Sequence, residues 1–169
     1  MTGMANQEEL QDSSQAVASL LLIALDFYGV PYELVRHRPT HSARAEARAI
    51  GIDPADVAKT VVLATPNGYV RAVLPASRLL DLAKVRALLD TDDVLLATEE
   101  MLAYAYPEFE LGAVPPVGGD RVDSVLIDRR TADRDWTIFE AGVHDHSLRV
   151  KSADLVRLAD ASVAAISQD

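Results

Sequence analysis

The sequence feature that most constrains the fold of this chain is a pair of β-forming segments joined by a tight turn. Residues 60–65 and 69–74 are rich in Val, Thr and Leu, and the short stretch Pro66-Asn67-Gly68 separates them. Pro, Asn and Gly are typical turn residues, and β-branched residues favour the strands on either side. The sequence therefore predicts an antiparallel hairpin in the middle of the chain.

Helix and strand signals alternate on both sides of this hairpin. Apolar residues at helical spacing predict a helix over 13–28, which Gly29 and Pro31 end. A helix over 43–50 follows, with Thr40 or Ser42 as its cap and Gly51 as its stop. Further predictions are strands over 32–35, 122–128, 136–140 and 147–150, helices over 82–89 and 99–106, and a last helix capped by Ser152. This mixture is typical of one mixed α/β or α+β domain.

Length and composition favour a single soluble core. The chain has 169 residues, of which 49% are hydrophobic, and this suits one domain. We assign residues 13–169 to that domain and expect residues 1–12 to form a flexible tail. The absence of cysteine excludes disulfides, thiolate nucleophiles and thiolate metal sites.

The first part of the chain lacks the marks of export or membrane insertion. The apolar run from Ala16 to Leu25 is shorter than the roughly 20 residues that span a bilayer. Residues 1–12 contain acids but no Lys or Arg, whereas a secretory signal begins with a basic region. We therefore expect a cytoplasmic protein with no membrane partner.

Charge is distributed unevenly along the chain. The net charge of −10 argues against a surface that coats DNA, since such binding depends on many phosphate contacts. Residues 36–89, however, carry nine Lys or Arg against four acids. This basic middle segment could hold one charged end of a polyanion, and scattered solvated charge is the alternative interpretation.

Most common catalytic signatures are missing, and the histidines form no complete metal site. The chain has no P-loop, no Gly-x-Gly-x-x-Gly and no Gly-x-Ser-x-Gly motif. Pro39 interrupts the spacing of His37 and His41, while His144 and His146 could share one side of a strand. Neither pair has an evident third ligand, so we predict no metal and no cofactor. A metal-dependent hydrolase that uses His144 and His146 is retained as an alternative.

Three local features remain as candidates for a site. Lys59 stands where an apolar strand begins, so its stem can pack while its ammonium meets a carbonyl, phosphate or oxyanion. A solvated surface lysine is the alternative, and the residue taken alone favours it. The stretch from Gly112 to Gly119 combines Gly, Pro and small residues, which suits a narrow, rigid pocket wall, and an irregular connector is the alternative. Asp128 ends a strand, where it could orient a substrate group or cap the following turn.

Taken in order, these segments resemble the YbaK/ProX family of aminoacyl-tRNA deacylases, which includes the editing domain of bacterial prolyl-tRNA synthetases. The resemblance extends from about Gly29 to Leu158. It is carried by Tyr32 to His37, the helix 43–50, Val57 to Leu63 with its lysine, Val73-Leu74-Pro75, Leu80-Asp81-Leu82, Ala97 to Glu100, the Gly-x-x-x-Pro element from Gly112 to Pro116, Val125 to Asp128, Phe139 to Gly142, and Ser152 to Leu155.

The resemblance implies a curved mixed β-sheet with surrounding helices and a pocket between them. It implies hydrolysis of the ester between a small amino acid, such as Ala, Ser, Thr or Cys, and the tRNA 3′ end. A non-catalytic module of the same fold that binds aminoacyl-tRNA or a synthetase is the alternative. The implied partners are the aminoacylated tRNA end and an aminoacyl-tRNA synthetase. Lys59 is the implied catalytic residue, and the expected substrate-binding residues are Gly112, Ala113, Val114, Pro115, Pro116, His37, Asp128 and Gly142.

Two departures from the family pattern concern the pocket loop. Val117 stands where many relatives carry an aromatic residue, and residues 112–115 lack the hydroxyl found in some relatives. A family enzyme needs no nucleophilic side chain, because water or the adjacent ribose hydroxyl can attack if charge on the carbonyl is stabilised. Lys59 and backbone N–H groups near Gly112 are the expected stabilisers.

Overall fold

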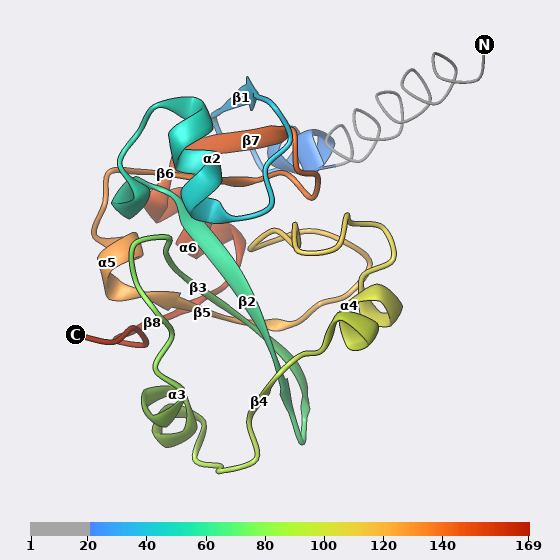
Figure 1. Cartoon of the computed structure of the whole chain (residues 1–169), viewed down its shortest axis with the longest axis vertical. Coiled ribbons are helices and arrows are strands. Elements are labelled where there is room, and N and C mark those ends of the chain that lie inside the picture. Colours follow the sequence, from blue (N-terminus) through green and yellow to red (C-terminus); the bar gives the residue numbers. More distant parts are fainter. Residues whose placement is uncertain (1–20) are drawn as a thin grey trace.

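The computed structural model describes residues 21–169, and its strands form two sheets rather than the single sheet expected from the resemblance. A small antiparallel sheet has the strand order β1-β7-β6, and a larger mixed sheet has the order β4-β2-β3-β5-β8 (Figure 1). A parallel bridge between Val57 and Ile138 connects the start of the hairpin with the small sheet. The predicted mixed α/β class is thus confirmed.

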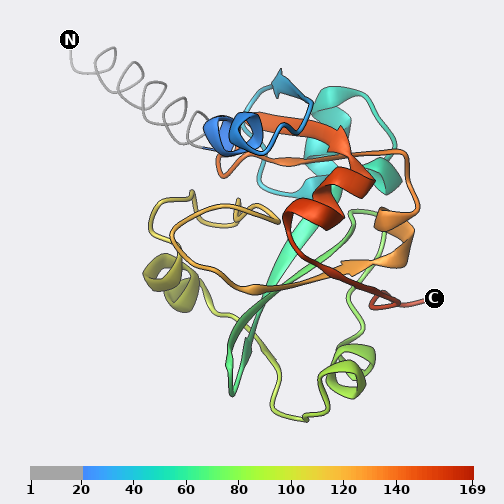
Figure 2. The same cartoon turned by 180° about the vertical axis from the view of Figure 1, so that it is seen from behind.

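The small sheet lies between two helices. Its strands are β1 (Tyr32–Arg36), β6 (Trp136–Glu140) and β7 (His146–Lys151). Helix α2 (Ala43–Ile50) lies toward the viewer in Figure 1 and α6 (Ser152–Leu158) in the reverse view of Figure 2, so they cover opposite sides. Residues 21–27 are helical and pack beside α6 on the largest core cluster.

The larger sheet is built on the predicted hairpin. Strands β2 (Ala58–Thr65) and β3 (Gly68–Pro75) pair antiparallel, with Thr65 opposite Gly68 at the turn. Strand β5 (Ser124–Asp128) pairs parallel with β3, and β8 (Ser162–Ala164) pairs parallel with β5. The two-residue strand β4 (Leu95–Leu96) completes the other edge.

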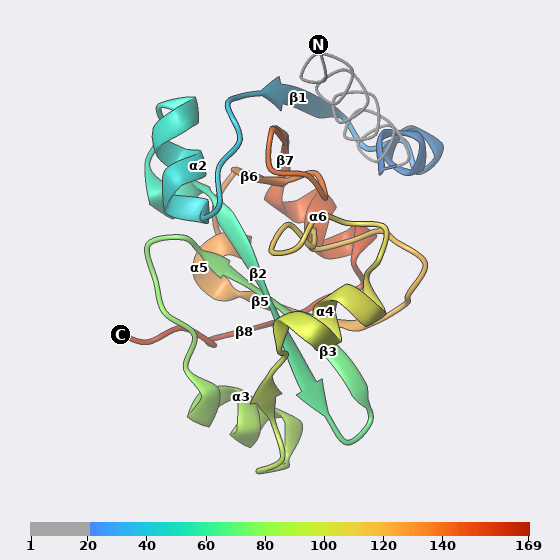
Figure 3. The same cartoon turned by 45° about the vertical axis from the view of Figure 1, so that its right-hand side comes forward.

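Alternate residues of β2 face two different helices, as a strand of period two requires. Leu63 is buried in a cluster with Val85 of α3 (Leu82–Leu89). Val62 is buried instead with Ala105 of α4 (Glu99–Ala105). Figure 3 shows the hairpin with α3 and α4 near its outer end. This alternation also decides which face of β2 presents each residue to the site described below.

Most predicted elements are confirmed, with three differences. Ser152 does not cap α6: Lys151 occupies the N-cap position, and the Ser152 hydroxyl is buried without a hydrogen-bond partner among residues 21–169. Strand β8 was not predicted, because only its pairing with β5 distinguishes it from a loop. The short helix α5 (Arg129–Ala132) stands where a turn was expected. The tail assigned to residues 1–12 and the start of the first predicted helix lie outside the described residues.

A short 3₁₀ segment, η1 (Pro54–Asp56), joins α2 to β2, and Asp53 caps it as the Asp-Pro pair predicts. It sets the direction in which β2 leaves the helix. None of the helices in the described part of the chain is long and apolar enough to cross a membrane.

Candidate functional site

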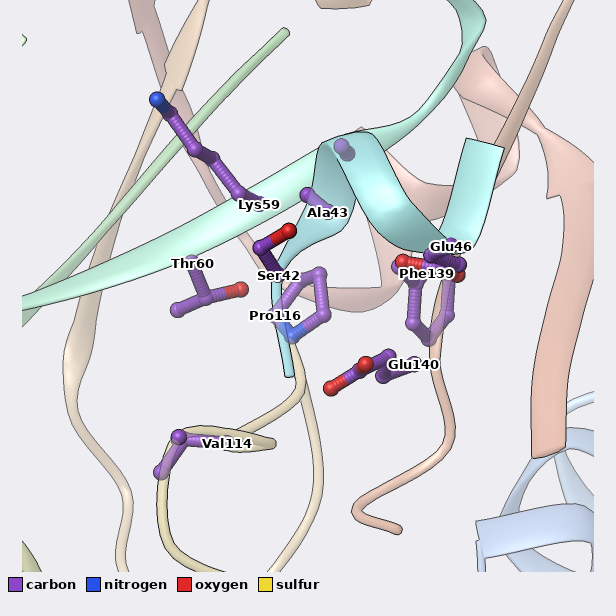
Figure 4. A pocket seen from close by; sticks show the side chains of 11 residues that line it. Ser42, Ala43, Glu46, Lys59, Thr60, Val114, Pro116, Phe139 and Glu140 are labelled. Atoms are coloured by element: carbon purple, nitrogen blue, oxygen red, sulfur yellow. The ribbon is translucent and has the colours of Figure 1, made fainter. Parts of the chain in front are cut away.

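A small pocket lies where α2, the start of β2, the end of β6 and the loop after α4 meet. Its cavity volume is about 50 Å³. Figure 4 shows the side chains around it, which come from segments far apart in the sequence. The lining residues are Ser42, Ala43, Glu46, Ala58, Lys59, Thr60, Gly112, Val114, Pro116, Phe139 and Glu140.

Helix α2 forms one wall, and its ends are fixed by local sequence. The Ser42 hydroxyl accepts a hydrogen bond from the backbone N–H of Ala45, and Gly51 ends the helix at a φ of 82°. Glu46 falls on the apolar face of this helix, next to Ala47, and its side chain is buried. A carboxyl group is thereby held at the pocket in surroundings that would ordinarily take an aliphatic residue.

The Gly-x-x-x-Pro loop forms the opposite wall. Gly112 has a φ of 85°, which glycine adopts without strain, and Val114 and Pro116 line the pocket. The loop is held from behind by the buried guanidinium of Arg71 in β3. Its Nη1 donates to the Pro115 carbonyl at 3.0 Å, and its Nη2 donates to the Gly118 carbonyl at 2.9 Å. The rigid wall predicted from composition thus depends on a cation that the sequence reasoning did not select.

Lys59 lies at the rim of the pocket, half-buried. It leaves β2 on the opposite side from Thr60, and in Figure 4 its side chain runs away from Glu46 and Glu140. Burial lowers the pKa of the Lys59 ammonium, and the nearby positive charge of Arg44 lowers it further. The Lys59 ammonium makes no hydrogen bond or ion pair with residues 21–169. The positive charge of Arg44 thus lies near the Lys59 ammonium, and no anion among residues 21–169 forms an ion pair with Lys59.

A chain of short hydrogen bonds leads from the pocket toward the surface. Oε1 of Glu46 lies 2.6 Å from the hydroxyl of Ser147 in β7, and that hydroxyl lies 2.7 Å from Nε2 of His37. Nδ1 of His37 lies 2.7 Å from the Arg38 carbonyl. Burial raises the pKa of Glu46 to about 8, while the Ser147 hydrogen bond opposes this rise. The His37 expected to contact substrate therefore reaches the pocket through Ser147 and Glu46.

A second polar pair, Glu140 and His144, closes the end of the pocket beside Gly112. The hydrogen bond to Glu140 raises the pKa of His144 to about 9, against the lowering effect of burial. The protonated ring donates from Nδ1 toward Glu140 at 3.4–3.5 Å and from Nε2 to the Leu111 carbonyl at 2.8 Å. His144 thereby ties the start of the Gly112 loop to β6.

Five of the predicted substrate-binding residues lie outside the pocket lining, namely His37, described above, and Ala113, Pro115, Asp128 and Gly142. Asp128 is fully buried: it caps α5 through the N–H of Arg130 and accepts bonds from the N–H groups of Ile166 and Ser167. It holds the C-terminal segment, as the capping alternative allowed. Gly142, Ala113 and Pro115 support the loop through backbone bonds.

The histidine pair considered for metal binding does not converge on one point. Both ring nitrogens of His144 are engaged as described, and Nδ1 of His146 lies 2.7 Å from Asp145. The described residues contain no group of three or more His, Cys, Asp or Glu side chains placed to hold a metal ion. The ring of His41 instead contacts that of His144 in a tilted arrangement, with centroids 4.9 Å apart and an interplanar angle of 58°.

Sequence reasoning missed Glu46, Ser147, Glu140, Thr60 and Arg71 as residues of the site or its support. One signal was available for Glu46, because it shares the helical face of Ala43, Ala47 and Ile50, where a charge interrupts an apolar stripe. No comparable signal marks Ser147, whose importance depends on the approach of α2 to β7.

Comparisons with known proteins agree with this geometry. The aminoacyl-tRNA editing domain family matches residues 37–158. Among solved structures, a candidate trans-editing enzyme for prolyl-tRNA synthetase has a TM-score of 0.82 and 23% identity, over 90% of this chain and 98% of the other.

Two further structures have the same fold. One comes from work on computational grafting of epitopes onto scaffold proteins, with a TM-score of 0.80 and 23% identity over 93% of this chain and 97% of the other. The other is a hypothetical protein, with a TM-score of 0.78 and 22% identity over 85% and 96%. No curated protein matches. Because the family match spans most of the chain, including the lysine strand and the Gly112 loop, this protein belongs to the family of YbaK-type aminoacyl-tRNA editing domains.

Proposed function

We propose that this protein is an aminoacyl-tRNA deacylase that hydrolyses the ester of a small, wrongly attached amino acid, such as Ala, Ser, Thr or Cys. The observation that carries the proposal is the pocket of about 50 Å³ between α2 and the Gly112 loop. A cavity needs roughly 10–15 Å³ of such space to hold one water, so this pocket has room for a few small groups and suits a short side chain. The loop is held by Arg71, so a larger side chain meets a wall that does not yield easily.

The proposed function has a physical reason. A synthetase pocket rejects an amino acid that lacks one methylene by only ~1–3 kcal/mol, which leaves errors on the tRNA. A second pocket that admits only small side chains removes those errors and spares the larger correct product. Selection by size needs a rigid wall more than it needs specific polar contacts.

Lys59 is proposed to act with Arg44 on the charged end of the tRNA. Lys59 has no partner among residues 21–169, and Arg44 donates only to the Ser77 carbonyl, at 3.3 Å. Two adjacent cations repel each other, so an entering phosphate lowers the energy of both. The phosphate next to the terminal ribose would then place the ester bond over the pocket, where Lys59 can also stabilise charge on the carbonyl oxygen.

We also propose that the protein acts on free mischarged tRNA in the cytoplasm, with or without a synthetase as partner. The structural neighbour described as a trans-editing enzyme for prolyl-tRNA synthetase makes proline tRNA the first substrate to test.

The test is a deacylation screen with purified full-length protein. Alanine, serine, threonine and cysteine esters of proline tRNA and several other tRNAs are incubated with enzyme, and the remaining ester is measured over time. We expect turnover of at least one small amino acid and none of the correctly matched, larger one. Binding of aminoacyl-tRNA without turnover of any ester would instead indicate a non-catalytic module.

A further inference from the structure

The hydrogen bonds among Glu46, Ser147 and His37 restrict where protons can reside. The carbonyl of Arg38 can only accept, so the Nδ1 atom of His37, 2.7 Å away, must carry a hydrogen. Nε2 of a neutral His37 is then an acceptor, and Nε2 becomes a donor only when the ring is protonated. The state of the ring therefore fixes the direction of its bond with Ser147.

The single hydrogen of the Ser147 hydroxyl passes this restriction on to Glu46. If His37 is neutral, Ser147 donates to Nε2, and Glu46 must be protonated to donate to Ser147. If Glu46 is ionised, Ser147 donates to Oε1, and His37 must be protonated to donate to Ser147. Both bonds, of 2.6 and 2.7 Å, are kept only when the Glu46–His37 pair holds one ionisable proton. Such short distances are typical of charge-assisted hydrogen bonds.

From this geometry we propose that Glu46 is the general acid–base group of the pocket, and that Ser147 and His37 form with it a proton relay toward the surface. The inference rests on the proposed deacylase function. Oε2 of Glu46 makes no hydrogen bond to residues 21–169, whereas Oε1 is held by Ser147, so Oε2 is the oxygen available to a substrate. Ser147 is fully buried and His37 only partly, which gives the relay an inner and an outer end.

The relay prepares the base before the ester is attacked. The Oε1–H bond of Glu46 breaks as a Ser147 O–H bond forms, and the original Ser147 hydrogen passes to Nε2 of His37. Glu46 becomes a carboxylate, His37 becomes an imidazolium, and the net charge of the cluster does not change. Burial favours neutral Glu46, and Glu140 favours it as well, whereas His144 opposes this. An ionised Glu46 is therefore costly without the compensating proton on His37.

In the reaction, Oε2 of Glu46 takes a proton from the attacking water as the new C–O bond forms. The same proton passes to the leaving ribose oxygen as the ester C–O bond breaks. Glu46 is thus unchanged at the end of the cycle, and the only reactants consumed are the ester and one water molecule. Ser147 and His37 do not touch the substrate and are positioning residues.

The first test requires no tRNA. The carboxyl carbon of Glu46 and Nε2 of His37 are observed by NMR across pH in wild-type protein, Ser147→Ala and Ser152→Ala. We expect the two signals to follow the same transitions in wild type, because strongly coupled groups titrate as a pair. They should separate in Ser147→Ala. Ser152→Ala is the matched control, because it also removes a buried serine hydroxyl, here one without a partner, and should behave as wild type.

The second test uses single-turnover deacylation at saturating enzyme. Glu46→Gln should slow hydrolysis about 10²- to 10⁴-fold, the usual contribution of a general acid–base group, with little change in tRNA affinity. Ser147→Ala should slow hydrolysis less and alter the pH profile of the rate, while Ser152→Ala should do neither.

The outcomes of the two tests separate this inference from the proposed function. Independent transitions of Glu46 and His37 in the wild-type protein would overturn the relay, whatever the enzyme hydrolyses. A folded Glu46→Gln variant with the wild-type rate would overturn the role of Glu46 as acid–base group. Coupled transitions in a protein that hydrolyses no ester would support the relay and refute the deacylase.

Discussion

Replacement of Gly112 by alanine tests the pocket wall most directly. The change adds one methyl group to a residue whose φ is 85°, a backbone conformation that costs an L-residue about 1–2 kcal/mol. The new Cβ would lie 3.7 Å from Cε1 of His144, an ordinary contact that adds no clash. Backbone strain therefore determines the loss of stability.

Gly51→Ala is a matched control for this strain. Gly51 has a φ of 82°, almost the same as Gly112, and a Cβ there would meet nothing within 4 Å. It ends α2 on the far side from the pocket lining. Both variants should lose about 1–2 kcal/mol, which corresponds to a fall in melting temperature of about 2–8 °C for a domain of this size.

Only Gly112→Ala should change the choice of substrate. Relief of the strain at residue 112 shifts the loop, and with it Val114 and Pro116, which line the pocket, so we expect the space for the amino-acid side chain to shrink. Thermal unfolding would measure stability, and deacylation of a series of esters would measure selectivity. We expect the largest accepted amino acid to lose the most turnover, whereas Gly51→Ala keeps the wild-type order.

Two results would refute this reasoning. A Gly112→Ala variant as stable as the wild type, with Gly51→Ala destabilised, would show that residue 112 does not have the assigned backbone conformation. An equal reduction of turnover for every amino acid in Gly112→Ala would show that the loop does not select by size.

Four further predictions concern charge and metal. Lys59→Ala should abolish most deacylation in a folded protein, and Lys59→Arg should not fully restore it. Single-turnover rates at saturating enzyme would distinguish a loss of binding from a loss of chemistry. A Lys59→Ala variant with the wild-type rate would exclude Lys59 from the mechanism. The pKa of His144 is raised from 6.5 to about 9, so its contribution to stability is present below pH 6.5 and lost as pH rises toward 9. Urea unfolding at both ends of that range should show that the free energy of unfolding falls less in His144→Gln than in wild type. The affinity for tRNA should fall only modestly with salt, because each phosphate contact contributes about −0.7 to −0.9 to the slope of log affinity against log salt concentration. A measured slope that corresponds to about eight contacts would contradict this prediction. Activity should survive chelation, and its loss with EDTA and return with zinc would support the metal-dependent alternative instead.

Local chemistry was enough to predict most of the elements. Pro66, Asn67 and Gly68 form the hairpin turn, Ser42 and Gly51 determine both ends of α2, and Asp53 with Pro54 determines the turn before β2. Each of these features depends on contacts within a few residues, so a sequence window contains the necessary information. The ordered lysine strand and Gly-x-x-x-Pro loop likewise predicted the family, because the resemblance depends on order along the chain.

The tertiary structure alone decided how the pocket is built. The alternation of β2 places Thr60 and Lys59 on opposite sides, but only packing shows which side holds the pocket and that Lys59 stands at its rim beside Arg44. Asp128 was predicted as a site residue from its place at a strand end, and long-range bonds to Ile166 and Ser167 occupy it instead.

The chain of Glu46, Ser147 and His37 shows the same limit most clearly. Glu46 and Ser147 are 101 positions apart, and His37 and Ser147 are 110 apart. Hydrogen bonds over such separations exist only after α2 has packed against the sheet of β1 and β7. Local sequence can place the Glu46 carboxyl on an apolar helical face. Its hydrogen-bond partner, the Ser147 hydroxyl, comes from a distant strand and reaches it only through tertiary packing.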